Sequence, residues 1–115
     1  MSWLKQVQEL RTLVISTTTN NPFTRTPEPI VLDGWQISFS RWRGSNDVCH
    51  CHLSVMLWPK GREHGPRDWE HLGEMVRAFG APPEPTAQLN KPHAPVHWNW
   101  FERADGSPLV NQHAN

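Results

Sequence analysis

Hydrophobic residues recur at helical spacing near the start of the chain. They fall at i, i+4, i+7 and i+11, which is one side of a helix, and they are Trp3, Val7, Leu10 and Val14. Ser2 can cap this helix. Residues 17–29 are rich in Thr and Asn and contain three prolines, a composition that ends a helix. We therefore expect a helix over residues 1–16 and an extended, Pro-rich arm over residues 17–29.

A second helical pattern lies in residues 68–79 (DWEHLGEMVRAF). Its hydrophobic residues fall at i, i+3, i+7 and i+10, and they are Trp69, Leu72, Val76 and Phe79. We expect Asp68 to be the N-cap of this helix, because its short carboxylate can accept hydrogen bonds from free backbone N–H groups. We expect Gly80 to end the helix in the left-handed conformation that favours glycine.

Apolar and polar residues alternate in three other segments, as they do in strands with one buried face. Residues 30–43 contain one strand, residues 44–47 (GSND) form a tight turn, and residues 48–57 return beside the first strand as a hairpin. Residues 96–101 (VHWNWF) form a later strand, and we expect residues 86–90 to add a short one.

The order of these elements, α-β-β-α-β-β, predicts an α+β fold in a single domain spanning residues 1–115. The expected architecture is an antiparallel sheet of about four strands with two helices against one face. The core then comprises residues 30–103. A polar tail, residues 104–115, follows it, with a turn at Asp105-Gly106.

Composition narrows the classes of function. The chain carries 11 basic and 11 acidic residues, so its net charge is zero. A net charge of zero gives no overall electrostatic attraction to a polyanion such as nucleic acid. A surface with charges of both signs favours a protein partner over nucleic acid, and near-neutrality makes self-association possible. No run of about 18 apolar residues occurs, so we expect no membrane partner. Two cysteines, one residue apart, exclude a disulfide framework and are typical of a reducing compartment.

The segment VCHCHL, residues 48–53, concentrates side chains that bind metals. In a strand, successive side chains point to opposite faces, so Cys49 and Cys51 share one face while His50 and His52 share the other. The four side chains therefore cannot converge on one zinc ion. Because the cysteines alternate with His and share the face of Leu53, we expect them in the core.

The two histidines leave three interpretations open. His50 and His52 are ordinary residues on a solvated sheet face, or they hold zinc or another divalent metal with a third ligand from elsewhere. The candidates for that third ligand are His97 and His93, and also Glu102, His64 and His71. In the third interpretation, His52 and His97 act as general acid and base on a phosphodiester without a metal. No nucleophile, Gly-rich phosphate loop or carboxylate pair supports catalysis, and we predict no catalytic residue.

Tryptophan and basic residues occur together near both ends of the predicted hairpin. Trp and Arg are favoured anchors of protein interfaces, and a basic aromatic patch can also stack bases. Because residues 43 and 48 flank the turn, the two groups lie at opposite ends of the hairpin and need not form one patch. The predicted partner-binding residues are Trp42, Arg43, Trp58, Lys60 and Arg62.

Residues 35–100 resemble a family of small proteins from tailed bacteriophages and prophages. The matching positions are His52-Leu53-Ser54-Val55, Trp69, Phe79-Gly80, His93, His97 and Trp100. The family supplies no activity or cofactor to transfer. The resemblance implies a viral protein that acts in the cytoplasm of a bacterial host or belongs to a virion.

The sequence and this resemblance together favour a small non-enzymatic binding protein. Its expected partner is a host or defence-system protein that it inhibits, in the manner of an anti-defence or anti-CRISPR protein. The alternatives are a His-ligated metal-binding domain or metal-dependent hydrolase, and a structural or assembly component of the virion.

Overall fold

The computed structural model describes residues 3–20, 23–25, 30–44, 46–59, 63, 65–82 and 96–109. Several predictions lie outside these residues: the strand over 86–90 and the site residues Lys60, Arg62 and His93. The elements are α1 (Trp3–Asn20), β1 (Phe23–Arg25), β2 (Ile30–Leu32), β3 (Trp35–Arg43), β4 (Val48–Leu57), α2 (Pro66–Ala78) and β5 (Val96–Arg103).

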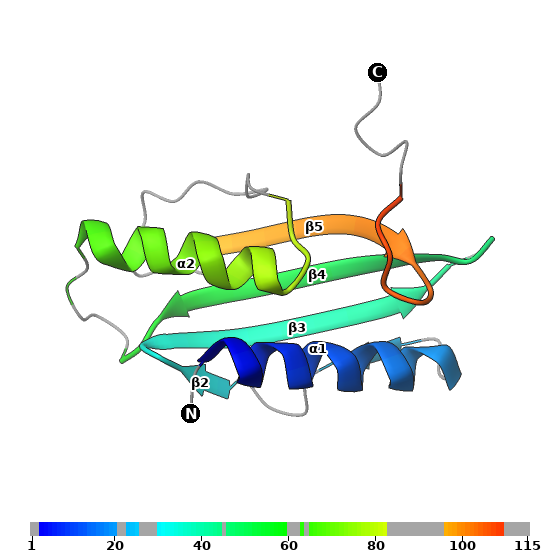
Figure 1. Ribbon diagram of the computed structural model, residues 1–115, viewed down its shortest axis with the longest axis horizontal. Coiled ribbons are helices and arrows are strands. Elements are labelled where there is room, and N and C mark those ends of the chain that lie inside the picture. The colour runs from blue at the N-terminus through cyan, green and yellow to red at the C-terminus, as the bar shows by residue number, and fades with distance from the viewer. Residues whose placement is uncertain are drawn as a thin grey trace, which may run out of the picture.

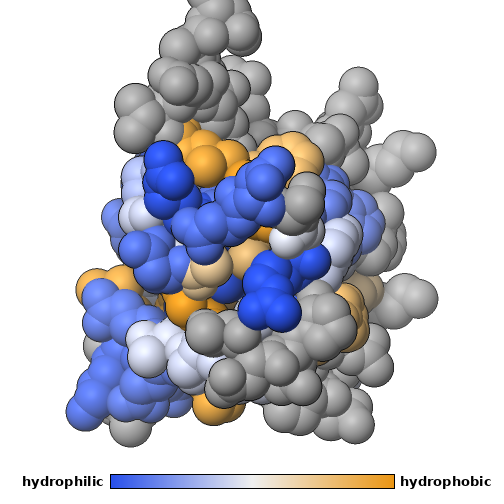
Figure 2. Space-filling view, turned by 90° about the vertical axis from the view of Figure 1, so that its right-hand side faces the viewer, coloured by the Kyte–Doolittle hydropathy of each residue, from blue (hydrophilic) through white to orange (hydrophobic). Residues whose placement is uncertain are grey.

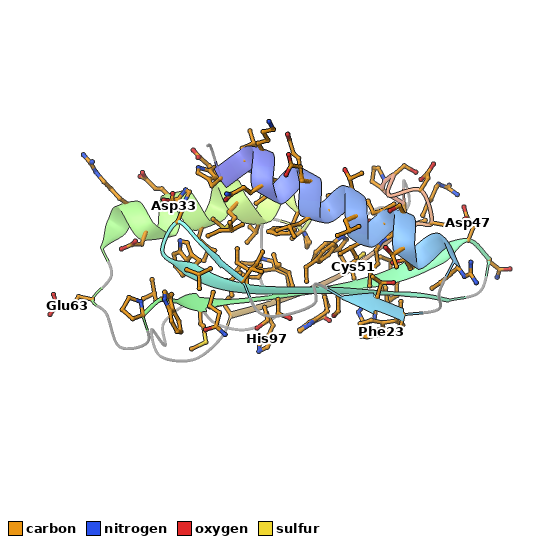
Figure 3. All side chains as sticks on the ribbon, turned by 90° about the horizontal axis from the view of Figure 1, so that it is seen from below. Phe23, Asp33, Asp47, Cys51, Glu63 and His97 are labelled. Carbon is orange, nitrogen blue, oxygen red and sulfur yellow. The ribbon has the colours of Figure 1, made fainter. Side chains whose placement is uncertain are left out.

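The strands form one antiparallel sheet in the order β1-β3-β4-β5. Strand β2 also pairs with β3, along residues 35–37, whereas β1 pairs along residues 40–42. Both helices lie on the same face of this sheet, and α1 runs along β3 (Figures 1 and 3). The core fills the space between sheet and helices. Its largest members include Trp35, Phe39 and Trp98 from the strands and Phe79 from the end of α2. The α+β prediction is confirmed.

The N-terminal helix is longer than predicted, and the arm is shorter. Helix α1 continues to Asn20 through the Thr-rich stretch that we expected to end it. The Thr17 and Thr18 hydroxyls donate to the carbonyls of Leu13 and Val14, so the hydroxyls are satisfied within the helix. Thr18 is also buried, which adds tertiary support. Further along the predicted arm, residues 23–25 form β1, which pairs with β3.

The segment 30–43 contains two strands, where the sequence predicted one. Asp33 and Gly34, both with positive φ, form a two-residue turn between β2 and β3. An Asp-Gly pair is a strong hairpin signal, because a type I′ turn needs positive φ at both central residues. The observed order of elements is therefore α-β-β-β-β-α-β.

Helix α2 begins two residues before the predicted start. Pro66 occupies its first turn and Gly65 is the N-cap, while the Asp68 carboxylate accepts a hydrogen bond from the Gly65 N–H at 2.8 Å. Asp68 therefore supports the helix start from inside the first turn, and its prediction as N-cap was wrong. Gly80 has a φ of 96°, so its prediction as the residue that ends the helix is confirmed.

The described part of the predicted tail folds back onto β5. The Gly106 N–H donates to the Arg103 carbonyl at 2.9 Å, which closes the predicted turn. Pro108 then forms an isolated bridge with Glu102. This turn covers one end of the core, where the carbonyls of Arg103 and Ala104 accept hydrogen bonds from the buried Arg41 side chain.

Candidate functional site

Among the residues that the structure describes, no helix covers one face of the sheet. This open face is formed by the even-numbered residues of β3 and β4 and the odd-numbered residues of β5, together with Phe23 and Arg25 of β1 and Val31 of β2. Figure 3 shows Phe23 and His97 on the side away from the helices, and Cys51 on the side facing them. Among the described residues of the open face, none is Asp or Glu, and the basic ones are Arg103 of β5 and Arg25 of β1, which is paired with Ser40.

Four rings cross the open face in a line. Phe23 is paired with Trp42, Trp42 with His50, and His50 with Phe101, so each ring comes from a different strand. The ring centroids are 6.1, 4.3 and 5.0 Å apart in that order. Phe23 is 52% exposed and Phe101 is 48% exposed, so this aromatic row is open to a partner at both ends.

The aromatic row borders a shallow depression at the end of the sheet where β3 turns into β4. Its volume is about 450 Å³, and its lining residues are Trp42, Gly44, Asn46, Val48, His50 and Phe101. Figure 2 views the molecule from this end, where hydrophobic residues show between hydrophilic ones among the coloured atoms. Apolar surface rimmed by polar residues is typical of interaction sites.

His52 and His97 meet in the middle of the open face. His52 Nε2 lies 3.0 Å from His97 Nδ1. The ring centroids are 5.1 Å apart and the rings are inclined by 21°. Because the nitrogens are much closer than the centroids, the rings meet edge to edge, with one N–H donating to the facing nitrogen. The structure thus brings together two histidines that the metal and the acid–base interpretations both used, and their roles as ligands or as acid and base stay predictions.

Burial lowers the pKa of His52 below its ordinary value of 6.5, and His97 and His50 add to the effect. His52 is therefore neutral at physiological pH. His50 does not join the pair, because its ring lies between Trp42 and Phe101 in the aromatic row. Within the described parts of the chain, no group of three or more His, Cys, Asp or Glu side chains could hold a metal ion.

The cysteines lie on the opposite face from the histidines, as the alternation predicted. Cys49 and Cys51 are fully buried on the face of the sheet opposite the histidines. Burial is the main cause that raises the pKa of both thiols, so neither thiol ionises near neutral pH. The expectation of core cysteines is confirmed.

The predicted anchors do not form one patch. Trp42 belongs to the aromatic row, whereas Arg43 is paired with Cys49, so these neighbours have side chains on opposite faces. Trp58 is 45% exposed and follows β4 at the other end of the hairpin. Its backbone N–H donates to the Gly34 carbonyl at 2.9 Å. The register therefore separates Trp42 from Trp58.

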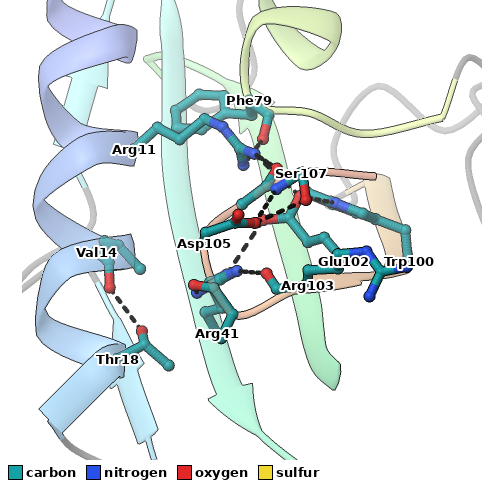
Figure 4. A network of polar contacts seen from close by, with 12 residues as sticks. Arg11, Val14, Thr18, Arg41, Phe79, Trp100, Glu102, Arg103, Asp105 and Ser107 are labelled. Atoms are coloured by element: carbon teal, nitrogen blue, oxygen red, sulfur yellow. Dashed lines mark hydrogen bonds and ion pairs between the residues drawn. The ribbon is translucent and has the colours of Figure 1, made fainter. Parts of the chain in front are cut away.

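A buried polar network was missed by the sequence analysis (Figure 4). Arg41 donates from Nε to Glu102 Oε1 at 3.2 Å, and Arg11 donates from Nη2 to Glu102 Oε2 at 3.1 Å. Trp100 also donates to this carboxylate, at 2.8 Å. A signal was available, since Glu102 follows Val96, Trp98 and Trp100 at the inward positions of β5. Arg41 follows three apolar inward residues of β3 in the same way. The network ties α1, β3 and β5 together.

Comparisons with protein-family models, with curated proteins and with solved structures found no match to this chain. Neither described helix is long and apolar enough to cross a membrane. The geometry of the open face therefore carries the functional argument.

Proposed function

We propose that this protein is a non-enzymatic binding protein that holds a partner protein on the open face of its sheet. In keeping with the resemblance to small phage proteins, the partner is a bacterial host or defence-system protein that binding inhibits. The observation that carries the proposal is the aromatic row, because large rings at this exposure are the residues that anchor protein interfaces.

The dimensions of the open face suit such a contact. Strands of this length, with about 3.3 Å per residue and about 4.8 Å between strands, give a face roughly 30 Å long and 15–20 Å wide. A planar area of that size is more than half of the roughly 800 Å² that each partner buries in a standard interface.

The charge of the open face indicates the chemistry of the partner. Its described residues include two arginines, Arg25 and Arg103, and no carboxylate, so the complementary surface is acidic around an apolar centre. The same reasoning makes nucleic acid the weaker candidate. Proteins that track a phosphate backbone carry several Lys or Arg along the groove, whereas this face has two among its described residues, on strands at opposite edges of the sheet.

The deciding experiment uses purified proteins. A protein captured from nuclease-treated bacterial lysate is purified and titrated calorimetrically against the wild-type chain and three variants. We expect Trp42→Ala and Phe101→Ala to raise the dissociation constant roughly tenfold or more, as interface anchors do. Leu13→Ala is the matched control, because Leu13 is 55% exposed on α1, on the helical side of the molecule. It should leave the affinity unchanged.

Three results would overturn the proposal. Equal affinity in all four proteins would remove the open face from the interface. Tight binding of a short single-stranded oligothymidine, lost in Trp42→Ala, would assign the face to nucleic acid. A dimer in sedimentation velocity that Trp42→Ala abolishes would assign it to a second copy of the chain.

A further inference from the structure

His52 and His97 hold two ring nitrogens at the spacing of neighbouring ligands on one metal ion. His52 Nε2 and His97 Nδ1 are 3.0 Å apart. Two imidazole nitrogens bound at about 2.0–2.1 Å to one ion lie about 2.9 Å apart at a bond angle of 90°, and about 3.3 Å apart at the tetrahedral angle. The observed separation falls between these values and is nearer to the first.

The surroundings of the pair suit a cation. In the sheet register, His52 lies between Ser40 and Asn99, and His97 lies beside Ser54. These neighbours are uncharged and offer oxygen atoms. Among the described residues, the other titratable side chain that acts on His52 is His50, two residues away on the same face. A divalent ion at the pair therefore meets neutral donors among the residues beside it.

We propose that His52 and His97 form a two-histidine site for a divalent transition-metal ion, with Cu²⁺ preferred to Ni²⁺ and Zn²⁺. Imidazole suits all three ions, and a bond angle near 90° is typical of Cu²⁺ and Ni²⁺. The proton between the two rings shifts to the other nitrogen of the ring that carries it, so both facing nitrogens present lone pairs. The ion exchanges two bound waters for these nitrogens.

The remaining coordination positions of the ion face outward from the sheet. Both side chains lie on the open face and are partly exposed, so water or a donor atom from another molecule can complete the coordination. With two protein ligands, the affinity is lower than that of a structural zinc site with four. The inference is independent of the proposed protein partner, since it requires only the isolated chain and the ion.

His50 is a matched control for this site. It lies on the same face of the same strand as His52, but its ring is held between Trp42 at 4.3 Å and Phe101 at 5.0 Å. Turning this ring toward an ion would break both contacts. The structure therefore assigns the ion to the pair that crosses from β4 to β5, and not to the two histidines of β4.

The test titrates the full chain with Cu²⁺ and then with Ni²⁺, following the bound metal by calorimetry. We expect His52→Gln and His97→Gln each to raise the dissociation constant roughly tenfold or more, and His50→Gln to leave it nearly unchanged. An equal loss in His50→Gln would place the ion on β4 alone and overturn the assignment. Equal affinity in all four proteins would also overturn it.

A second measurement uses only the wild-type chain, so it does not depend on the folding of any variant. Paramagnetic Cu²⁺ at less than one equivalent broadens the ring-proton resonances nearest to it. The proposal expects the resonances of His52 and His97 to disappear before those of His50. Broadening that begins at His50, or at neither member of the pair, would overturn it.

Discussion

Arg41 and Glu102 form an ion pair inside the core, with 3.2 Å between Nε and Oε1. Arg41 is 0% exposed and Glu102 is 2% exposed, so both charged groups are buried away from water. Arg41 also donates to the carbonyls of Arg103 and Ala104, in the turn that follows β5. Desolvation of two charges is costly, and it is offset here because each charge has several partners.

Removing one charge of this pair should be strongly destabilising. Glu102→Gln keeps the size of the side chain but leaves Arg41 without a counter-charge, and we expect a loss of about 3–5 kcal/mol in the free energy of unfolding. Urea denaturation measures this loss. Arg11→Met is the comparison, because the Arg11 side chain is 18% exposed and should contribute less to the network. Equal losses in the two variants would contradict this account of the network.

The alternation of buried and open positions could be predicted from the sequence because inward residues in β3, β4 and β5 are mostly apolar. That pattern placed Cys51 in the core and His52 on the other face without any structure. Arg41 and Glu102 break the pattern, and their pairing could not be predicted, because it depends on how β3 and β5 are placed around β4.

The extent of α1 and the presence of β1 depend on tertiary contacts. Thr18 stays helical because its hydroxyl is satisfied within the helix and its side chain is buried. Strand β1 is three residues long, and its pairing with β3 defines it. The aromatic row also depends on tertiary contacts, because Phe23 and Phe101 fall in one line only when four strands are paired in this register.

The two thiols should be unreactive in the folded protein. Cys49 and Cys51 are fully buried and burial raises the pKa of both, so neither forms the nucleophilic thiolate near neutral pH. Ellman's reagent should detect almost no thiol in native protein at about pH 8 and both thiols in guanidinium chloride. Rapid reaction of either thiol in native protein would show that the core opens more readily than this packing allows.

Stability should decrease with acidification through His52. Its pKa is lowered in the folded chain, so between that value and 6.5 the unfolded chain binds more protons at this ring. The stability contributed by neutral His52 is therefore complete above about pH 6.5 and is lost progressively below it. The thermal midpoint should fall less between about pH 7.5 and pH 5 in His52→Gln than in the wild type. Parallel curves for the two proteins would contradict this prediction.

Two glycines should respond to alanine in opposite directions. Gly80 has a φ of 96°, and a Cβ there would lie 2.9 Å from Arg11 Nη1, so Gly80→Ala should cost about 1–2 kcal/mol. Gly73 lies inside α2, where the nearest atom to an added Cβ is 3.9 Å away. Gly73→Ala should therefore stabilise the protein by about 0.5–1 kcal/mol. Chemical denaturation of the two variants checks both signs, and a gain in Gly80→Ala would count against the described helix end.

The central claim is that the open face is the surface that binds a partner protein, and site-specific photocrosslinking tests it most directly. A benzoylphenylalanine replaces Phe101 at the exposed end of the aromatic row in one protein, and Leu13 on the outer side of α1 in another. Both proteins are irradiated in nuclease-treated bacterial lysate. The account predicts a discrete protein crosslink from position 101 and none from position 13. Crosslinking from position 13 alone would place the interface on the helical side and contradict the account.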